Sequence, residues 1–392
     1  MKILAVNAGS SSMKFQLFEM PEEKVLVSST FERIGLDNSF YSIKVDDKKT
    51  KKDAVLLNHE DACNLFLNEL LENKIVSNLE EISSIGHRIV HGADKYNKSV
   101  LIDDTVIKDI EECIPLAPLH NPAGILGIRA MREALPNAKN VAVFDTAFHQ
   151  TMDEKAFLYP VPYEWYTNYG VRRYGFHGTS HHYVSTRIAS LLGTNEYKAI
   201  ICHLGNGASI SAVLNGKCVE TSMGITPVSG IPMGTRCGDI DPSIIEYVMR
   251  TSGKTIDEVM TDLNKKSGLL GISGVSSDSR DIEDAIEAGN QRAVLARDIY
   301  VRRIASFVAS YYCILGGADV IAFTAGIGEN SQDTREQVMK LLKPLGVLID
   351  DEANNVRGVE RLISDKASKI KCYIIPTNEE LMMVKETYEL SK

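Results

Sequence analysis

The chain has 392 residues, of which 44% are hydrophobic and 24% are charged, and its formal net charge is −9. The length predicts two domains, and the composition is typical of a soluble globular protein. The negative charge argues against nucleic acid or an anionic membrane surface as a partner. The longest uncharged run, between Arg303 and Asp319, is too short to span a membrane. Seven cysteines without a Cys-x-x-Cys pair, and an N-terminus that lacks a signal-like segment, predict a reducing cytoplasmic location and no zinc cluster.

The first residues form a strand–turn–strand pattern. An apolar strand from residue 3 leads into a Gly/Ser turn that carries Asn7, Ser10, Ser12 and Lys14, and a second strand follows. Residues 24–31 are typical of a third strand. Backbone N–H groups in such turns bind anions, and small side chains let phosphate oxygens approach.

The same pattern recurs in residues 199–221, with a tight hairpin at Asn215-Gly216. Its turn consists of His203, Leu204, Gly205, Asn206 and Gly207. Two such turns facing each other would hold a polyphosphate from both sides. Neither turn fits Gly-x4-Gly-Lys-Ser/Thr or Gly-x-Gly-x-x-Gly, which disfavours the Walker and Rossmann interpretations. We therefore expect an enzyme that uses ATP.

Helical patterns follow each repeat, over 60–72 and 122–134 in the first half and over 180–192 and 291–315 in the second. An apolar strand over 320–324 then enters a third glycine turn, where an adenosine would lie. This turn contains Gly326, Ile327, Gly328, Glu329 and Asn330. Ile327 would be an apolar contact and Asn330 a polar one.

A duplicated βββαβα unit is the architecture of the actin-like ATPase and sugar-kinase superfamily, a ribonuclease H-like fold. We thus predict an α/β protein of two domains with a nucleotide cleft between them. The expected domains are 1–150 plus about 381–392, and 151–380, which would carry most of the nucleotide site. The irregular, aromatic stretch 150–175 would contain the boundary.

Several charged residues follow strands or lie in stiff loops of the first half. Arg88, in Gly86–Gly92, suits an anion clamp. His120 lies in a proline-bounded loop, and Asp145 ends an apolar strand, where it is either a catalytic or metal-binding acid or a turn residue.

In the second half, His177 and His181 have a zinc-like spacing, but a helix start lies between them and the acid of His-Glu-x-x-His is missing. We interpret His177 as a donor to phosphate. Arg236 lies in a glycine-bounded loop, and we expect Asp239 and Asp241 to hold its guanidinium, which would stabilise a transferring phosphoryl group.

Two further segments complete the candidate site. Asp278, Ser279 and Arg280 would contact a ribose or adenine, or Asp278 would cap a helix, and both roles are compatible. Glu379 follows a strand over 372–375 and is a candidate for Mg²⁺, through water.

Together these motifs resemble the acetate kinase family over essentially the whole chain. The resemblance rests on Val6–Ser12, Gly86–Gly92, Ala117–Pro122, Val143–His149, Tyr174–Ser180, His203–Gly207, Gly234–Arg236 and Thr324–Asn330. Any one of these motifs is weak, and their common order is specific.

The resemblance implies reversible transfer of phosphate from ATP to acetate, giving acetyl phosphate and ADP, with Mg²⁺ (Mn²⁺ as the alternative) and a homodimer. It assigns acetate and the moving phosphoryl group to Arg88 and Arg236, the transition state to His177 and Arg236, an essential acid to Asp145, and the metal to Asn7 and Glu379. It assigns the nucleotide to Lys14, residues 203–207, 278–280 and 326–330, and the methyl group to Val90, Leu119, Phe176 and Pro227.

The chemistry agrees with these residue types. Acetate is already ionised at neutral pH, so it needs positive charge rather than a general base. Arg88, Arg236, His120 and His177 supply that charge, and Asp145 would orient an arginine or a metal-bound water. The alternatives are a propionate or broader acyl kinase, a hydroxyl-directed kinase, and a non-metabolic actin-like ATPase.

Two departures from the family pattern stand out. Cys237 stands where Ser is expected, and Ala93 where a second Gly is common. Our hypothesis is that Cys237 makes the site sensitive to thiol oxidation.

Overall fold

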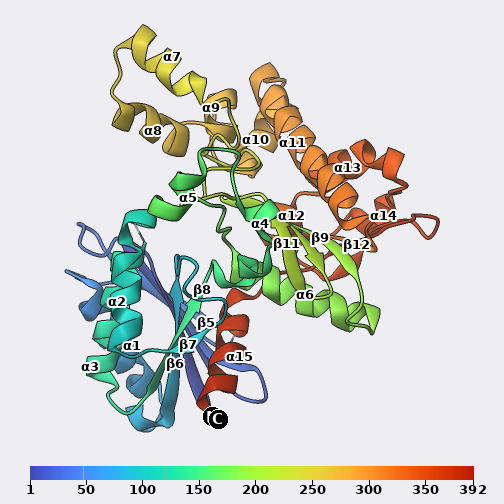
Figure 1. The fold of residues 1–392 in the computed structure, drawn as a ribbon. Helices are drawn as coiled ribbons and strands as arrows, with labels where there is room; N and C mark the ends of the chain where they lie inside the picture. The colour runs from blue at the N-terminus through green and yellow to red at the C-terminus, as the bar shows by residue number, and fades with distance from the viewer. Residues whose placement is uncertain (47, 119) are drawn as a thin grey trace. The chain divides into compact units, whose positions relative to one another are not determined.

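The computed structural model describes residues 1–46, 48–118 and 120–392. The chain divides into two compact units (Figure 1). The first unit comprises Met1–Gln150 and Asn378–Lys392, and the second comprises Thr151–Thr377. The C-terminal segment thus returns to the first unit three residues earlier than the expected 381.

The first unit is built on an eight-stranded sheet of order β5-β4-β3-β2-β1-β6-β8-β7. β1, β6 and β8 are parallel, and β1, β2 and β3 form an antiparallel meander. The strands are β1 (Lys2–Ala8), β2 (Ser12–Glu19), β3 (Lys24–Glu32), β4 (Phe40–Val45), β5 (Lys48–Asp53), β6 (Ile82–Ile89), β7 (Val100–Leu101) and β8 (Lys139–Phe144).

Helices cover both faces of this sheet. A methyl group at Gly86 would collide with Thr387 of the last helix, whereas Ile89 meets Gly124 of α3. Since side chains alternate along a strand, these two helices lie on opposite faces. The helices of this unit are α1 (His59–Glu72), α2 (Asp104–Glu112), α3 (Asn121–Ala134) and α15 (Glu379–Ser391), with 3-10 turns η1 (Leu79–Glu81), η2 (Ile114–Leu116) and η3 (Ala147–Thr151), whose last residue opens the second unit.

The second unit repeats the same strand order. Its sheet runs β11-β10-β9-β12-β14-β13, so an antiparallel meander again continues into two parallel strands. The strands are β9 (Lys198–Leu204), β10 (Ala208–Leu214), β11 (Lys217–Thr221), β12 (Val320–Thr324), β13 (Arg361–Leu362) and β14 (Lys371–Ile374).

Within the second unit, α6 packs on β9 and β12, and α11 packs on β9 and β10. α7 and α8 extend away from this sheet (Figure 1). The helices are α4 (Glu154–Phe157), α5 (Tyr163–Tyr169), α6 (Gly178–Leu192), α7 (Ser243–Ser252), α8 (Ile256–Lys265), α9 (Gly268–Ser273), α10 (Ser279–Glu287), α11 (Gln291–Leu315), α12 (Ala325–Asn330), α13 (Gln332–Leu341) and α14 (Asp351–Asn354), with η4 (Lys343–Leu345).

The predicted α/β fold with a duplicated βββαβα unit is confirmed, with three local corrections. The hairpin β4–β5 was not predicted, because its second strand is dominated by exposed lysines. The expected glycine turn over 325–330 is the short helix α12, which Ala325 enters with φ of 63°. The stretch 150–175, expected to be irregular, contains α4 and α5.

Candidate active site

In the first unit, an arginine and an aspartate form a two-pronged ion pair at the carboxyl ends of two parallel strands. Arg88 is in β6, and Asp145 directly follows β8. Arg88 Nη2 lies 2.6 Å from Asp145 Oδ2, and Arg88 Nε lies 3.0 Å from Oδ1. The Asp145 side chain is only 2% exposed, whereas that of Arg88 is 22% exposed. Asp145 therefore fixes the guanidinium, and Arg88 keeps part of its surface accessible.

Two more carboxylates surround this pair. Glu379 and Glu380 open α15, and both act electrostatically on Arg88. Burial lowers the pKa of Arg88, but Asp145 and the two glutamates outweigh burial and raise it above its ordinary value. Burial, opposed by Arg88 and reinforced by Asp145 and Glu380, raises the pKa of Glu379 to about 7. This corner of the first unit therefore has an excess of negative charge.

The first Gly/Ser turn joins β1 to β2. Asn7 and Lys14 are directly opposite in this hairpin, and Lys14 acts electrostatically on Glu379. Ser10 is exposed and Ser12 is half-buried, so their hydroxyls are available to a ligand. These polar groups share the first unit with the carboxylates described above.

One residue that supports this turn was missed by the sequence analysis. His59, the first residue of α1, places its Nε2 2.7 Å from the Gly9 carbonyl oxygen. Since its buried ring lies 50 positions away in the chain, no local motif indicates the contact.

The remaining residues predicted in the first unit lie on loops beside β6 and α3. Val90 follows β6 and is half-buried. His120 is half-buried at the N-cap position of α3, with φ of −122°. Leu119, predicted to contact the methyl group, lies outside the described residues.

In the second unit, His177 is held by a chain of alternating histidines and serines. It occupies the N-cap position of α6 with φ of 57°, a left-handed conformation that is uncommon for a residue with a side chain. Its Nδ1 lies 2.9 Å from Ser209 Oγ, which lies 2.8 Å from His181 Nε2. His181 Nδ1 in turn lies 2.6 Å from Ser211 Oγ. His203 stacks on His177 with ring centroids 4.1 Å apart.

Arg236 and His177 both lie close to Gly207. A methyl group added at Gly207 would lie 3.4 Å from both Arg236 Nη1 and His177 Nε2. Arg236 Nη1 approaches the Pro227 carbonyl oxygen at 3.5 Å and Met233 Sδ at 3.8 Å. Burial lowers the pKa of Arg236. The Arg236 guanidinium and a ring nitrogen of His177 therefore both border the position where Gly207 has no side chain.

The expectation that two aspartates hold Arg236 is wrong. Asp239 instead accepts a hydrogen bond from the Gly230 backbone, and Asp241 accepts one from the Ser243 backbone. Among the described residues no carboxylate forms an ion pair with Arg236. Because its charge is not neutralised by a protein group, Arg236 suits an anionic ligand.

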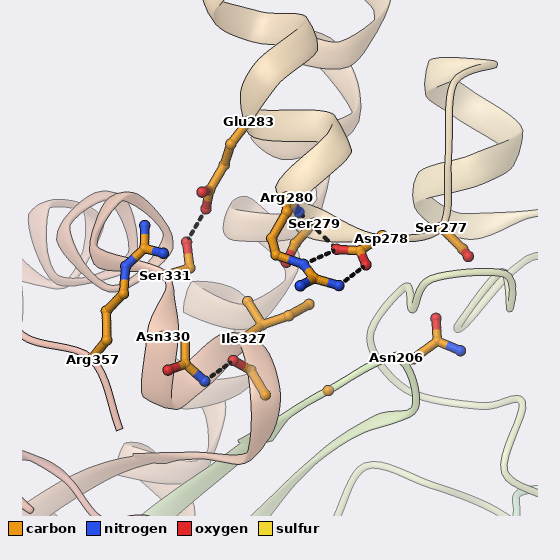
Figure 2. Close-up of a pocket in the computed structure, with 12 residues that line it drawn as sticks. Asn206, Ser277, Asp278, Ser279, Arg280, Glu283, Ile327, Asn330, Ser331 and Arg357 are labelled. Atoms are coloured by element: carbon orange, nitrogen blue, oxygen red, sulfur yellow. Dashed lines mark hydrogen bonds and ion pairs between the residues drawn. The ribbon is translucent and has the colours of Figure 1, made fainter. Parts of the chain in front are cut away.

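A cavity of about 670 Å³ lies in the second unit, within the range of nucleotide-sized ligand sites. Figure 2 shows Asp278 and Arg280 on one wall and Ile327 and Asn330 on α12 opposite. Asp278 caps α10, and Arg280 Nη2 donates to its Oδ2 at 2.6 Å. The charged hydrogen bonds from Arg280 lower the pKa of Asp278 to about 2. The cavity thus combines an apolar side chain with fixed polar groups.

Not all of the predicted nucleotide residues line this cavity. Gly205, Asn206, Asp278, Ser279, Arg280, Gly326, Ile327 and Asn330 do, whereas His203, Leu204, Gly207, Gly328 and Glu329 do not. Glu329 instead accepts hydrogen bonds from the Ala325 and Thr377 backbones. The sequence analysis missed Ser277, Glu283, Ser331 and Arg357, which come from loops and helix positions without a glycine-rich motif.

Two predicted apolar contacts belong to the second unit. Phe176 is buried directly before His177, and Pro227 is half-buried with its carbonyl oxygen toward Arg236. In the part of the chain that the structure describes, no three His, Cys, Asp or Glu side chains are arranged to hold a metal ion. Across the same residues, no helix has the length and apolar character needed to cross a membrane.

Comparison with known proteins shows which family the chain matches. A model of the acetokinase family matches residues 2–385. The acetate kinase of Bacillus subtilis is 53% identical over 393 residues and is covered, like this chain, to 100%. That of Geobacillus sp. is 53% identical over 392 residues, which cover 100% of this chain and 99% of the relative. The chain belongs to the acetokinase family.

Solved structures of this family share the fold. Acetate kinase of Porphyromonas gingivalis, 45% identical, matches with a TM-score of 0.96 over 100% of both chains. A propionate kinase from Francisella tularensis subsp. tularensis, 43% identical, matches with a TM-score of 0.94 over 99% of both. The resemblance stated from the motifs is thereby confirmed, and the chain is a kinase of the acetokinase family. The fold alone does not separate the acyl acceptors named for these two structures.

Proposed function

We propose that this acetokinase catalyses reversible transfer of the γ-phosphoryl group of ATP to acetate. The observation that carries the proposal is the convergence of Arg236 and His177 at Gly207, with no carboxylate among the described residues pairing the guanidinium. An anion at that position would accept hydrogen bonds from both side chains. A phosphoryl group in transfer is such an anion, and it is stabilised mainly by positioned positive charge.

The reaction needs no proton transfer from the acceptor. An oxygen of the acetate carboxylate attacks the γ-phosphorus, the bond from phosphorus to the β,γ-bridging oxygen breaks, and ADP leaves. Since acetate is ionised near neutral pH, Asp145 has no proton to remove. The two-pronged contact with Arg88 supports an orienting role for Asp145. Arg88, held in this way, would bind the acetate carboxylate.

The nucleotide would occupy the cavity of the second unit. Ile327 would pack against the adenine, while Asp278 and Arg280 would contact the ribose. The turn that contains Asn206 would approach the phosphates through its backbone N–H groups. In the first unit, Ser10, Ser12 and Lys14 would bind phosphate oxygens from the other turn.

The residues of the first unit fit a Mg²⁺ ion. Glu379 lies among Asp145 and Glu380, and the buried negative charge there would be relieved by a divalent cation. Mg²⁺ commonly uses one or two carboxylates, waters and substrate phosphates rather than a full set of protein ligands. Asn7 and Glu379 would hold it, in part through water. When bound, Mg²⁺ neutralises charge on the phosphate oxygens.

Acetate is the acceptor we propose, with propionate or a broader range of short acids as the alternative. Val90 of the first unit, and Phe176 and Pro227 of the second, would each contact the methyl group. The alternative is favoured by the likeness to a protein named as a propionate kinase. One methylene changes the binding free energy by only about 1–3 kcal/mol, so the preference between the two acids depends on small differences in pocket size.

We also infer a cytoplasmic homodimer. The cysteines Cys63, Cys113, Cys202, Cys237, Cys313 and Cys372 are free, which suits a reducing compartment. α7 has no buried residue, and it exposes Ile244 and Tyr247 to 43% and 60%. Exposed apolar side chains on one helix support a protein contact there. Sedimentation of the Ile244→Ser, Tyr247→Ser variant tests this: a shift from dimer to monomer supports the surface, and a monomeric wild type contradicts the homodimer.

The activity is tested with Mg-ATP and hydroxylamine, which traps acyl phosphate as hydroxamate. Acetate, propionate, butyrate, glycerol and no acceptor are compared in parallel. Hydroxamate that depends on acetate supports the proposal, and the ratio to propionate defines the preference. ADP released with glycerol, or with no acceptor, without hydroxamate would instead indicate a hydroxyl-directed kinase or an ATPase.

A further inference from the structure

The first unit also contains a cavity. It lies at one end of the sheet, and Arg88 and Asp145 lie at the other end. Its volume is about 440 Å³, and it is lined by Ile82 at the start of β6, Lys139 at the start of β8, and Ser391 at the end of α15. Because β6 and β8 are parallel, their first residues lie together, and their last residues hold the candidate site. Ser84, which also lines the cavity, is four residues before Arg88 in β6, roughly 13 Å along the strand. The cavity is thus distinct from the site described above.

Two hydroxyl groups in the wall of this cavity have no hydrogen-bond partner among the described residues. Ser84 is completely buried, Ser391 is 4% exposed, and the Oγ atom of each is unpartnered. Both residues line the cavity. Buried hydroxyls nearly always have a partner, because leaving one unpaired is costly. Each of these hydroxyls is therefore a donor that an added acceptor would satisfy.

The two serines belong to the same interface between β6 and α15. A methyl group at Gly86 would meet the Thr387 side chain, so this face of β6 packs on α15. Ser84 is two residues before Gly86 and points to the same face. Ser391 is one helical turn after Thr387 and lies on the same side of α15. Thr387 differs from them in that its hydroxyl donates to the Met383 carbonyl oxygen.

The rest of the wall is mainly apolar, with a cation at its edge. Apolar side chains come from Leu79, Ile82, Leu135 and Pro136. Lys139, which pairs with Ser84 in the register of β6 and β8, donates to the Ser391 carbonyl oxygen at 2.9 Å. No carboxylate pairs with it within the described part of the chain. The exposed Glu80 is the acidic side chain among the lining residues.

We propose that this cavity binds a small monocarboxylate with an apolar chain longer than that of acetate. The carboxylate oxygens would accept hydrogen bonds from Ser84 and Ser391 and lie near the Lys139 ammonium. The chain would pack against Leu79 and Leu135. Such a ligand fits because its carboxylate accepts hydrogen bonds from the unpaired hydroxyls, while its alkyl chain matches the aliphatic side chains of the wall. This site does not depend on the proposed acetate reaction.

Octanoate is the probe, with calorimetry on the full chain as the readout. We expect one octanoate per chain with a dissociation constant below about 1 mM, unchanged by saturating ATP and acetate. Octanol, which has the same chain without the carboxylate, should bind at least about tenfold more weakly, a difference of about 1.4 kcal/mol.

Three variants separate this site from others. Ala134→Phe fills the cavity from α3 and should abolish binding, whereas the matched Ala130→Phe, on the same helix outside the cavity lining, should not. Ser84→Ala should weaken octanoate binding at least about tenfold while the free protein melts at the same or a higher temperature, because the variant removes an unpaired hydroxyl. Retained melting temperature shows that the variants fold.

Several results would overturn the proposal. One is no octanoate binding up to about 10 mM, as expected if water alone fills the cavity. The others are binding that survives in Ala134→Phe, and binding that is displaced by acetate, which would assign the octanoate to the acceptor pocket of the kinase reaction.

Discussion

The Ser209 hydroxyl lies 2.9 Å from Nδ1 of His177 and is also shared with His181. A hydroxyl has one proton, so Ser209 can donate to only one of the two imidazoles. When Ser211 donates to His181 Nδ1, His181 donates to Ser209, and Ser209 donates to His177. The proton of His177 then resides on Nε2, beside Arg236. In this arrangement His177 presents an N–H to an anion.

Removing the Ser209 hydroxyl should impair turnover more than nucleotide binding. We expect Ser209→Ala to lower kcat on the order of tenfold, about 1.4 kcal/mol, because the hydrogen bond that positions the His177 ring is lost. KM for ATP should change little, since Ser209 does not line the nucleotide cavity. Steady-state kinetics check this, with Ser209→Thr as the variant that keeps the hydroxyl. Equal kcat for Ser209→Ala and the wild type would contradict a role of Ser209 in positioning His177.

Arg88 and Asp145 should act as one functional element. Asp145→Asn and Arg88→Ala are each expected to lower kcat/KM for acetate roughly a hundredfold, about 2.7 kcal/mol, because both lose the oriented guanidinium. The double variant should then be no worse than Arg88→Ala alone. A double-mutant cycle measures this. Additive losses would instead indicate an independent role for Asp145, such as that of a general base.

Arg280 should contribute to nucleotide binding rather than to chemistry. It lines the cavity and is held by Asp278 at 2.6 Å. We expect Arg280→Ala to raise KM for ATP about tenfold, or 1.4 kcal/mol, with kcat and KM for acetate nearly unchanged. Arg129→Ala is the matched control, since Arg129 forms a surface ion pair with Glu111. An effect of Arg280→Ala on acetate alone would contradict the assigned nucleotide cavity.

The local motifs of the sequence indicated the duplicated fold and the glycine-rich turns, because these depend on short-range pattern. Gly205 and Ile327, which belong to two of these turns, line the cavity. Contacts made by residues distant in the chain could not be predicted in this way. Glu283 reaches Ser331 at 2.5 Å across 48 positions, and neither lies in a recognisable motif.

The Arg236 loop shows why proximity in sequence misleads. Asp239 and Asp241 lie close to Arg236 in the chain, yet their carboxylates accept from the backbone N–H groups of Gly230 and of Ser243, the first residue of α7. A buried or half-buried loop must pair its backbone donors, and short acidic side chains do this well. A charge pattern does not show which backbone N–H groups need an acceptor. Because the two aspartates accept from such groups, Arg236 is left available for a ligand.

Cys237 should react slowly, contrary to the hypothesis of a thiol-sensitive site. Burial raises the pKa of its thiol, and Sγ lies 3.1 Å from the Gly238 carbonyl oxygen. Since the thiolate is the reactive form, we expect alkylation of Cys237 by iodoacetamide at pH 7 to be slower than that of the exposed Cys313. Mass spectrometry of timed samples measures both rates. Faster labelling of Cys237 would restore the hypothesis.

His87 should make the protein less stable at mildly acidic pH. Its ring is buried beside Asn140, with Nε2 2.8 Å from Asn140 Oδ1, and burial lowers its pKa to about 4. The unfolded chain takes up a proton near pH 6.5, whereas the native protein does so only near pH 4. The stabilisation is therefore fully present above about pH 6.5, and it is lost as the pH falls toward 4.

The magnitude of this effect is set by the difference between the two pKa values. The full shift corresponds to about 3 kcal/mol of unfolding free energy lost between pH 6.5 and 4. Urea unfolding of the wild type and of His87→Gln at pH 7.5, 6 and 5 isolates this contribution, because every other titrating group is common to both proteins. We expect the stability advantage of the wild type over the variant to shrink as the pH falls. An advantage that is constant would show that the pKa of His87 is the same in the native and unfolded protein, and one that grows toward pH 5 would show that the native protein holds the proton more tightly. Either result would contradict the lowered pKa of His87.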